Sequence, residues 1–443
     1  MNKNLAVAAV IVGGLVGIPA LVEAATAIES ALMLLWVVAV LWLTETFHIT
    51  VTALLIPVLA VALGLLDMTA ALENFAHPVI FLFLGGFALA AAMHVQGLDK
   101  WLAAGVLRLT RGRLCAGVVL LAAATGLLSM WISNTAITAV MLPLILGLLG
   151  QRDDLEPRTQ AFSVLAIAYS ANIGGIGTII GSPPNAIVAA QLGLSFTDWL
   201  AVGLPVALAL WPVMIFLLFA ILRPDFRDNR VDVEHQAFDW TPHRTILIGI
   251  FLLAAAGWLF GEPLARLLGI QGSMDTWVAL VVILLLAVAR VATWKQIEHS
   301  ADWGVLLLFG GGLTLSAVLQ ASGASTFLGA GLAELIGGWP GLLVLLVLVA
   351  FVVFLTEVTS NTATTALLVP VFAALPLGFM APGAAAMAIG ISASCAFMLP
   401  VATPPNALVH GTGRVTQNTM IKTGLRLNLV AVILLTVILN LLL

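Results

Sequence analysis

Long apolar runs, separated by short polar stretches, recur along the chain from one end to the other. Runs such as residues 5–22, 31–44, 246–260 and 427–443 can cross roughly 30 Å of hydrocarbon as α-helices. The pattern leaves no soluble domain of useful size. It therefore predicts an all-α integral membrane protein.

Assigning a helix to each apolar run divides the chain into two similar halves. In the first half we expect spans near 5–27, 30–47, 50–66 and 78–97, an interfacial stretch over 99–113, a hairpin at 114–149, a broken span at 159–194 and a span at 198–222. In the second half we expect spans near 246–263, 275–293 and 302–322, an interfacial piece at 325–338, a hairpin at 340–376, a broken span at 383–412 and a last span at 423–443. Each hairpin is expected to re-enter the membrane with its polar tip inside protein, because lipid offers the tip no hydrogen bonds.

Four motifs recur between the halves at nearly constant spacing. Ser133-Asn134-Thr135 returns as Ser360-Asn361-Thr362 and Pro143 as Pro370, both 227 positions later; Gly85-Gly86 returns as Gly311-Gly312 after 226, and Pro183-Pro184-Asn185 as Pro404-Pro405-Asn406 after 221. An odd number of crossings per half would invert the second copy, and inverted repeats are typical of secondary transporters. We therefore predict two inverted repeats with about 11 transmembrane helices, two re-entrant hairpins and two broken helices.

The repeat divides the chain into five parts. These are first-repeat scaffold helices with an interfacial helix (1–113), a first-repeat transport part (114–222), a cytoplasmic linker (223–245), second-repeat scaffold helices (246–338) and a second-repeat transport part (339–443).

Composition and charge agree with a membrane location. Hydrophobic residues make up 62% of the chain and charged residues only 9%, against about a quarter charged in soluble domains. If the N-terminus is cytoplasmic, only Arg266 lies outside, and the cytoplasmic side holds Lys3, Lys100, Arg108, Arg111, Arg113, Arg152, Arg158, Arg223, Arg227, Arg230, Arg244, Arg290, Lys295, Arg414, Lys422 and Arg426. This asymmetry predicts a multi-pass protein of the inner (plasma) membrane with a cytoplasmic N-terminus.

The repeated motifs also encode helix starts inside the membrane. Ser182 and Thr403 each supply a capping hydroxyl before a Pro-Pro pair, and the two Ser-Asn-Thr tips precede the second arms of the hairpins. Four helix N-termini with about +0.5 charge each would offer on the order of +2, which suits a dianion without any buried Arg or Lys. Unwound carbonyls and nearby Ser, Thr and Asn oxygens are ligands suited to sodium.

Single polar residues in the apolar runs carry weaker signals. A lone Ser-Asn-Thr or Pro-Pro-Asn is usually structural, and only its recurrence favours a functional reading. Glu45 favours an interfacial structural role, whereas Glu357, three residues before Ser360, could equally shape the tip or sense ions. The isolated histidines, for which packing is the favoured role, are His48, His94 and His410.

Motifs of enzymes are missing from the sequence. It contains no HExxH, no GxSxG and no GK[ST] after Gly174-Gly175-Ile176-Gly177, and Cys115 and Cys395 have no metal-binding spacing. We predict a transporter and not an enzyme, with an intramembrane enzyme or a binding scaffold as the remote alternative. Nothing suggests a nucleic-acid partner.

The repeated motifs resemble those of the divalent-anion:sodium symporter family, which includes INDY-type dicarboxylate and citrate transporters. The resemblance covers essentially the whole chain and rests on Thr44-Glu45, both Ser-Asn-Thr tips, Gly181-Ser182-Pro183-Pro184-Asn185 and the stretch 394–409. It implies a homodimer, in which a scaffold holds a mobile transport domain that moves as an elevator. It also implies symport of divalent anions, most readily the C4-dicarboxylates succinate, fumarate and malate. A sodium-independent exchanger and a sulfate or citrate carrier remain alternatives.

The same resemblance assigns site residues, position by position. The first sodium site would use Ser129, Ser133, Asn134 and Gly181, and the second Thr356, Thr359, Asn361 and Ala402, partly through backbone carbonyls. The anion would contact Asn134, Thr135, Ser182, Asn361, Thr362, Thr403 and Pro404. At least two sodium ions would bind together with the anion.

Overall fold

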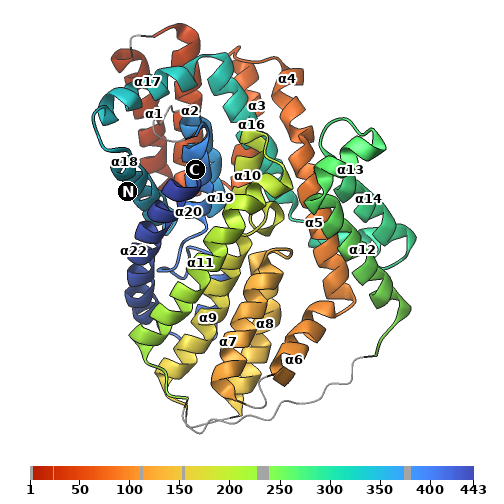
Figure 1. The fold of residues 1–443 in the computed structure, drawn as a ribbon. Helices are drawn as coiled ribbons and strands as arrows, with labels where there is room; N and C mark the ends of the chain where they lie inside the picture. Colours follow the sequence, from red (N-terminus) through yellow and green to blue (C-terminus); the bar gives the residue numbers. More distant parts are fainter. Residues whose placement is uncertain (1–2, 23, 110–112, 152–154, 227–238, 374–380) are drawn as a thin grey trace.

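The computed structural model describes residues 3–22, 24–109, 113–151, 155–226, 239–373 and 381–443 (Figure 1). Within these ranges the chain forms α-helices and short 3₁₀ turns, without any strand. The predicted all-α class is therefore confirmed. Four of the basic residues used to predict the topology (Arg111, Arg152, Arg227 and Arg230) and residues 374–376 of the second hairpin lie outside the described ranges.

The first half contains eleven helices and two 3₁₀ turns within its described residues. They are α1 (Lys3–Leu21), α2 (Thr26–Thr44), α3 (Ile49–Ala62), α4 (Met68–Glu73), η1 (Asn74–Ala76), α5 (Pro78–Val95), α6 (Leu98–Leu109), α7 (Leu114–Ser129), α8 (Asn134–Gly150), α9 (Pro157–Gly175), η2 (Ile179–Gly181), α10 (Pro183–Leu192) and α11 (Phe196–Leu222). The hairpin is α7 and α8, and the broken span is α9 and α10, as the sequence predicts.

The second half follows the same plan, again within its described residues. Its helices are α12 (Pro242–Leu259), α13 (Gly261–Leu268), α14 (Met274–Val288), α15 (Trp294–Ser300), α16 (Trp303–Ala321), α17 (Ala324–Ile336), α18 (Gly341–Leu355), α19 (Asn361–Phe372), α20 (Ala384–Ala393), α21 (Pro404–Gly411) and α22 (Gln417–Leu442). A bend of 117° separates α17 from α18, so the interfacial piece is distinct from the first arm of the hairpin.

Some predicted boundaries are wrong. Helix α1 ends at Leu21 and not near residue 27, and α22 begins six residues earlier than predicted, because Thr416 caps it by accepting a hydrogen bond from the Thr419 backbone N–H (3.2 Å). The short helices α4, α13 and α15 were not predicted. They have six to eight residues, too few to produce a clear periodic pattern in the sequence.

The described helices differ in whether they are long enough to cross a membrane. Among the described helices, six are long and apolar enough to cross a membrane, and the bent pair α17–α18 would make a seventh. Both arms of the first hairpin, α19 and α20 are apolar but shorter, with 10 to 17 residues. The total of about 11 crossings remains a prediction.

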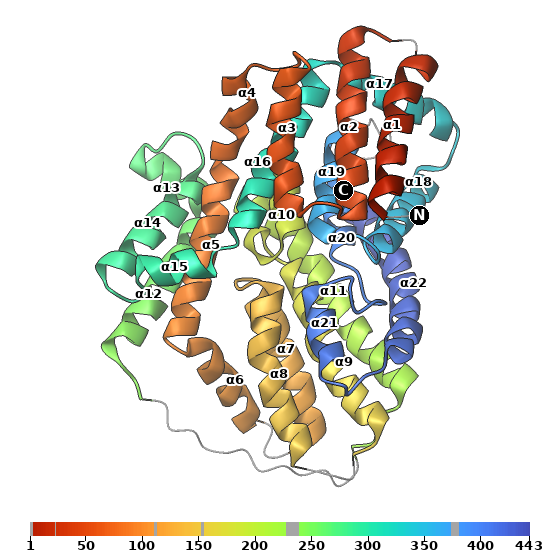
Figure 2. The same ribbon diagram turned by 180° about the vertical axis from the view of Figure 1, so that it is seen from behind.

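The two halves interlock around the breaks. Helix α10, beyond the first break, packs against α19 of the second hairpin, and α21, beyond the second break, packs against α8 of the first hairpin. The view from behind shows α21 beside α8 and α9 (Figure 2). Each half-helix thus lies against the hairpin of the opposite half, so the four internal helices belong to one packed unit.

Candidate functional site

All four internal helices begin at the residues that the sequence predicts. Helices α8, α10, α19 and α21 have Ser133, Ser182, Ser360 and Thr403 as their N-cap residues. Ser133, Ser360 and Thr403 accept a hydrogen bond from a backbone N–H in the first turn, as capping hydroxyls normally do. Ser182 instead lies 3.5 Å from the hydroxyl of Ser394 in the opposite half.

At the first tip, oxygen atoms from three segments surround the amide of Asn134. That amide group lies 2.6 Å from the Ser129 hydroxyl, 3.1 Å from the Ala171 carbonyl and 3.2 Å from the Gly181 carbonyl. Its nitrogen can donate to these carbonyls when no ion is bound. When the amide is rotated so that its oxygen points inward, the oxygens of Ser129, Asn134, Ala171 and Gly181 face one another. Four oxygens form a ligand set that fits sodium.

Gly175 makes this arrangement possible. A Cβ atom at this position would lie 2.5 Å from the Asn134 amide and 3.0 Å from the Gly181 carbonyl oxygen. Any larger residue would push the hairpin tip away from the unwound segment. Gly175 is therefore part of the site although it was not predicted as a ligand.

The second tip reproduces the first with different side chains. The Thr356 hydroxyl lies 2.5 Å from the Asn361 amide oxygen and donates to the Ala393 carbonyl at 3.2 Å, as Ser129 does to Asn134 and Ala171. The Thr359 hydroxyl donates to the Leu355 carbonyl at 2.9 Å and contacts Thr364 at 2.7 Å. Its own hydroxyl is thus occupied within the hairpin.

The remaining predicted ligands differ in exposure. Ser182, Thr362, Ala402 and Thr403 are buried, whereas Thr135 and Pro404 are exposed. The packing of α10 on α19 and of α21 on α8 brings the elements that carry them together. The roles of these residues, of Ser133 and of Gly181 remain predictions. The tips and unwound segments at 129–135, 178–185, 356–364 and 394–406 contain no Lys or Arg.

Two residues that the sequence did not single out join the halves. Asn172 donates to the Thr403 hydroxyl at 3.1 Å and to the Asn406 amide oxygen at 3.5 Å. Ser394, which is 222 positions later, makes the corresponding contact with Ser182. Each break is therefore completed by a side chain from the other repeat. Their offset of 222 lies within the range of 221 to 227 found for the repeated motifs, and this is the signal that could have suggested the pair.

The asparagines of the two Pro-Pro-Asn motifs hold the unwound backbone. Asn185 donates to the carbonyls of Gly175 and Thr178, both at 2.7 Å. Asn406 donates to those of Ala396 and Leu399 at 3.0 and 3.1 Å. Each of these four unwound carbonyls accepts one amide hydrogen bond and keeps a second lone pair, so the expectation that unwound carbonyls can bind cations remains a prediction.

Glu357 connects three elements through its carboxylate. Oε1 accepts hydrogen bonds from the backbone N–H groups of Phe397 (2.7 Å) and Met398 (2.8 Å) and from the Asn428 amide of α22 (2.7 Å), and Oε2 accepts from the Leu399 N–H (2.9 Å). A fully hydrogen-bonded carboxylate of this kind shapes the second break. The structure thus supports the first of its two predicted roles.

The other polar residues singled out in the sequence have local partners. His48 caps α3, His94 lies 3.0 Å from Asp99, and His410 lies 3.2 Å from the Val415 carbonyl. Glu45 is exposed at the end of α2, where its φ of 48° ends the helix. These placements agree with the structural roles that the sequence favours.

Comparison with known proteins finds similar transporters. A family model described as citrate transporter matches residues 39–387. An uncharacterized transporter of Haemophilus influenzae is 49% identical over 414 residues, which covers 91% of this chain and 90% of that protein. The sodium-dependent dicarboxylate transporter SdcS of Staphylococcus aureus is 34% identical over 439 residues, covering 90% of this chain and 82% of that protein.

A solved structure has a similar fold. The chain superposes on the Alcanivorax borkumensis YdaH transporter with a TM-score of 0.58, covering 89% of this chain and 98% of that one. The two sequences are 19% identical, so this likeness concerns the fold alone.

Proposed function

This chain belongs to the citrate transporter family, of the divalent-anion:sodium symporter type, and from that premise we propose that it carries C4-dicarboxylates together with sodium. It is a multi-pass membrane transporter and not an enzyme. The observation that carries the proposal is the doubled arrangement of Ser129 and Asn134 at one tip and of Thr356 and Asn361 at the other. The name of the Staphylococcus relative supports sodium and a dicarboxylate as its cargo.

In this proposal each tip binds one sodium ion and one end of the anion. The first ion takes oxygens from Ser129, Ser133, Asn134 and Gly181, and the second from Thr356, Thr359, Asn361 and Ala402. Thr359 contributes through its backbone carbonyl, since its hydroxyl is engaged elsewhere. The two carboxylates of the substrate contact Asn134, Thr135 and Ser182 at one end, and Asn361, Thr362, Thr403 and Pro404 at the other. Helix N-termini then supply the positive potential for the anion.

We also propose that the protein is a homodimer, that each subunit contains two inverted repeats, and that it lies in the inner membrane with a cytoplasmic N-terminus. Within this dimer the transport part moves as an elevator. Support for movement comes from the surface at the first tip. Trp131 lies with its ring 6.1 Å from that of Trp258 and 5.0 Å from that of Phe251, both on α12 of the scaffold part. Aromatic pairs favour stacked or edge-to-face geometries and are worth about 0.5 to 1.5 kcal/mol each beyond the area they bury, so exchanging them for similar ring contacts along α12 would cost little.

We expect sodium-driven uptake of labelled succinate by the purified protein in liposomes, with a rate that rises more steeply than first order in sodium. Two equivalent tips bind at least two cations, so the rate depends on more than one sodium ion. A dianion carried with only two sodium ions would move no net charge. The measurement compares vesicles with and without an inward sodium gradient. Equal uptake without sodium, driven by dicarboxylate inside the vesicles, would instead identify an exchanger.

We expect succinate, fumarate and malate to compete with labelled succinate better than sulfate does. Each tip offers similar polar groups, so a ligand with two separated carboxylates fits both, and compact sulfate cannot. Citrate brings a third carboxylate without an additional Arg or Lys, and desolvating it would cost several kcal/mol. Citrate should therefore compete mainly at low pH, in its doubly charged form. Stronger competition by sulfate than by fumarate would show that the site has one centre and not two ends.

A further inference from the structure

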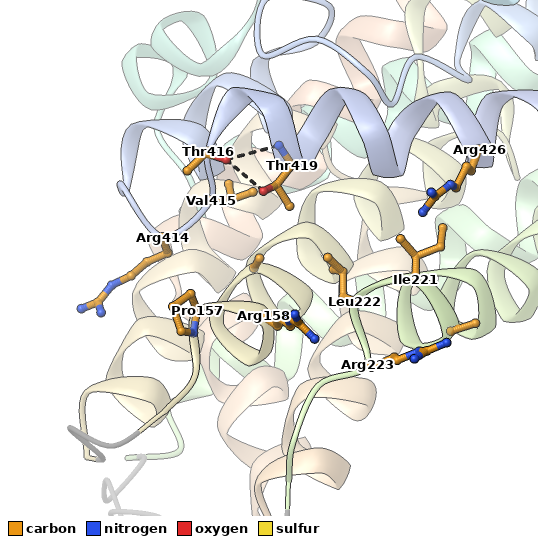
Figure 3. Close-up of a pocket in the computed structure, with 12 residues that line it drawn as sticks. Pro157, Arg158, Ile221, Leu222, Arg223, Arg414, Val415, Thr416, Thr419 and Arg426 are labelled. Carbon is orange, nitrogen blue, oxygen red and sulfur yellow. Dashed lines mark hydrogen bonds between the residues drawn. The ribbon is translucent and has the colours of Figure 1, made fainter.

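Away from the tips, a basic pocket of about 650 Å³ opens between the N-terminal end of α9, the C-terminal end of α11 and the start of α22 (Figure 3). Four arginines line this pocket: Arg158, Arg223, Arg414 and Arg426. Most of the other lining side chains are apolar or are threonines. In Figure 3, Arg158, Arg223 and Arg426 surround Ile221 and Leu222, whereas Arg414 points away from them.

Among its described residues the pocket is lined by four arginines and by no acidic side chain, while Glu156 and Asp225 line a neighbouring pocket that shares Arg223. Within the described ranges, Arg158, Arg223 and Arg426 form no ion pair, and Arg414 donates to the neutral amide oxygen of Gln160 at 2.9 Å. Like charges gathered around one pocket repel one another unless an anion lies among them. The transport reaction proposed above uses none of these residues.

The backbone at Arg223 ends α11 and places this residue beside the pocket. Its φ is 49°, in the left-handed region that glycine adopts without strain at helix ends and that other residues rarely adopt. Here a strained arginine ends α11 directly beside the pocket. Glu45 and Arg290 adopt the same conformation after α2 and α14, so what sets Arg223 apart is its place in the pocket.

Exposed apolar residues continue from the arginines along both helices. On α11, Phe219 and Phe216 lie four and seven positions before Arg223, on the same helix face, and are 47% and 68% exposed. On α22, Leu429 and Ile433 lie three and seven positions after Arg426 and are 50% and 62% exposed. Helices α11 and α22 pack against each other, and each carries an exposed apolar stripe that leads away from the same basic pocket.

We propose that this pocket binds the phosphate headgroup of an anionic phospholipid, whose acyl chains lie along the α11 and α22 stripes. Basic pockets between membrane helices bind such headgroups. An arginine guanidinium can donate two parallel hydrogen bonds to two oxygens of one phosphate. The stripes favour a lipid over free phosphate, because a soluble anion would make no use of them. The pocket lies at the end of the molecule that the charge asymmetry assigns to the cytoplasm, where anionic lipids attract basic residues.

The test compares binding of phosphatidylglycerol and phosphatidylcholine with identical acyl chains, measured by native mass spectrometry of the purified full-length protein. Each basic residue near a membrane surface contributes about 1 kcal/mol, which corresponds to roughly fivefold in affinity. We therefore expect the triple variant Arg158→Gln, Arg223→Gln, Arg426→Gln to bind phosphatidylglycerol about 100-fold more weakly, with phosphatidylcholine binding unchanged. A matched triple variant, Arg266→Gln, Arg290→Gln, Lys295→Gln, removes three exposed charges from another part of the molecule and should bind as wild type does.

A competition arm separates lipid from soluble anions. Inorganic phosphate and glycerol phosphate, added at millimolar concentration, should leave bound phosphatidylglycerol in place, since they lack acyl chains. Displacement of the lipid by either compound would overturn the lipid assignment and show a site for soluble phosphate. Equal loss of phosphatidylglycerol in the two triple variants would mean that charge anywhere on the surface suffices, which also overturns the proposal. All of these measurements are independent of transport.

Discussion

Replacing Asn134 or Asn361 by alanine is expected to reduce sodium-driven succinate uptake about 100-fold or more. Each asparagine lies at the centre of a tip, where its amide contacts the hydroxyl of Ser129 or Thr356. In the proposed mechanism the same amide meets a sodium ion and a carboxylate. Losing two charge-assisted contacts at about 1.5 to 3 kcal/mol each accounts for an effect of this size. The measurement is the initial rate of uptake in liposomes.

A matched control is Asn440→Ala, which removes an exposed asparagine near the end of α22. This variant should transport as wild type does, and all three variants should elute as wild type in size-exclusion chromatography. The two tip variants should retain their thermal stability within a few degrees, because Asn185 and Asn406 still hold the unwound backbone of the two breaks. Uptake within twofold of wild type in both tip variants would contradict the proposed site.

Replacing Glu357 by alanine is expected to destabilise the protein by at least about 3 kcal/mol. Its carboxylate satisfies three backbone N–H groups of the second break and the amide of Asn428. Each buried donor left without a partner costs about 1 to 3 kcal/mol. The unwound segment should then lose its shape, and transport should fall with it. Thermal unfolding in detergent, followed together with uptake, measures both effects.

Comparison of several variants shows whether Glu357 stabilises the backbone of the second break or contacts the transported ions. Asn428→Ala removes one partner of the carboxylate but leaves the three backbone contacts, so it should be milder than Glu357→Ala. Glu45→Ala removes an exposed carboxylate and should change neither property. If Glu357→Ala unfolded at the temperature of wild type yet changed the sodium dependence, Glu357 would act on ions and not on the backbone.

The sequence was sufficient to predict where the internal helices begin. A capping hydroxyl, and in the broken spans a following Pro-Pro pair, specify a helix start through local chemistry, and α8, α10, α19 and α21 begin there. Recurrence at a constant offset identified the matching motifs. Local signals of this kind need no knowledge of distant contacts, which is why they succeeded.

Contacts between distant segments could not be predicted in the same way. Glu357 meets backbone groups 40 to 42 residues away and Asn428 71 residues away, and no local pattern encodes such pairs. Asn172 lies inside an apolar helix with no neighbouring motif, so it gave no signal alone. Thr359 was assigned by resemblance, but its hydroxyl lies within reach of Thr364 on the next helix. That competition depends on how the two arms pack.

The exchange of partners between the two breaks has a consequence for biosynthesis. Asn172 and Thr403 are 231 positions apart. The ribosome must therefore add about 230 further residues after Asn172 before Thr403, its partner, is made. At roughly 5 to 20 residues per second this interval lasts on the order of 10 to 50 s. During it the first break lies in the bilayer without its counterpart, and the second half must arrive before either break is complete. Joining of the two halves is therefore a late step of assembly, and the newly inserted first half depends on water or on other membrane components to satisfy its polar groups until then.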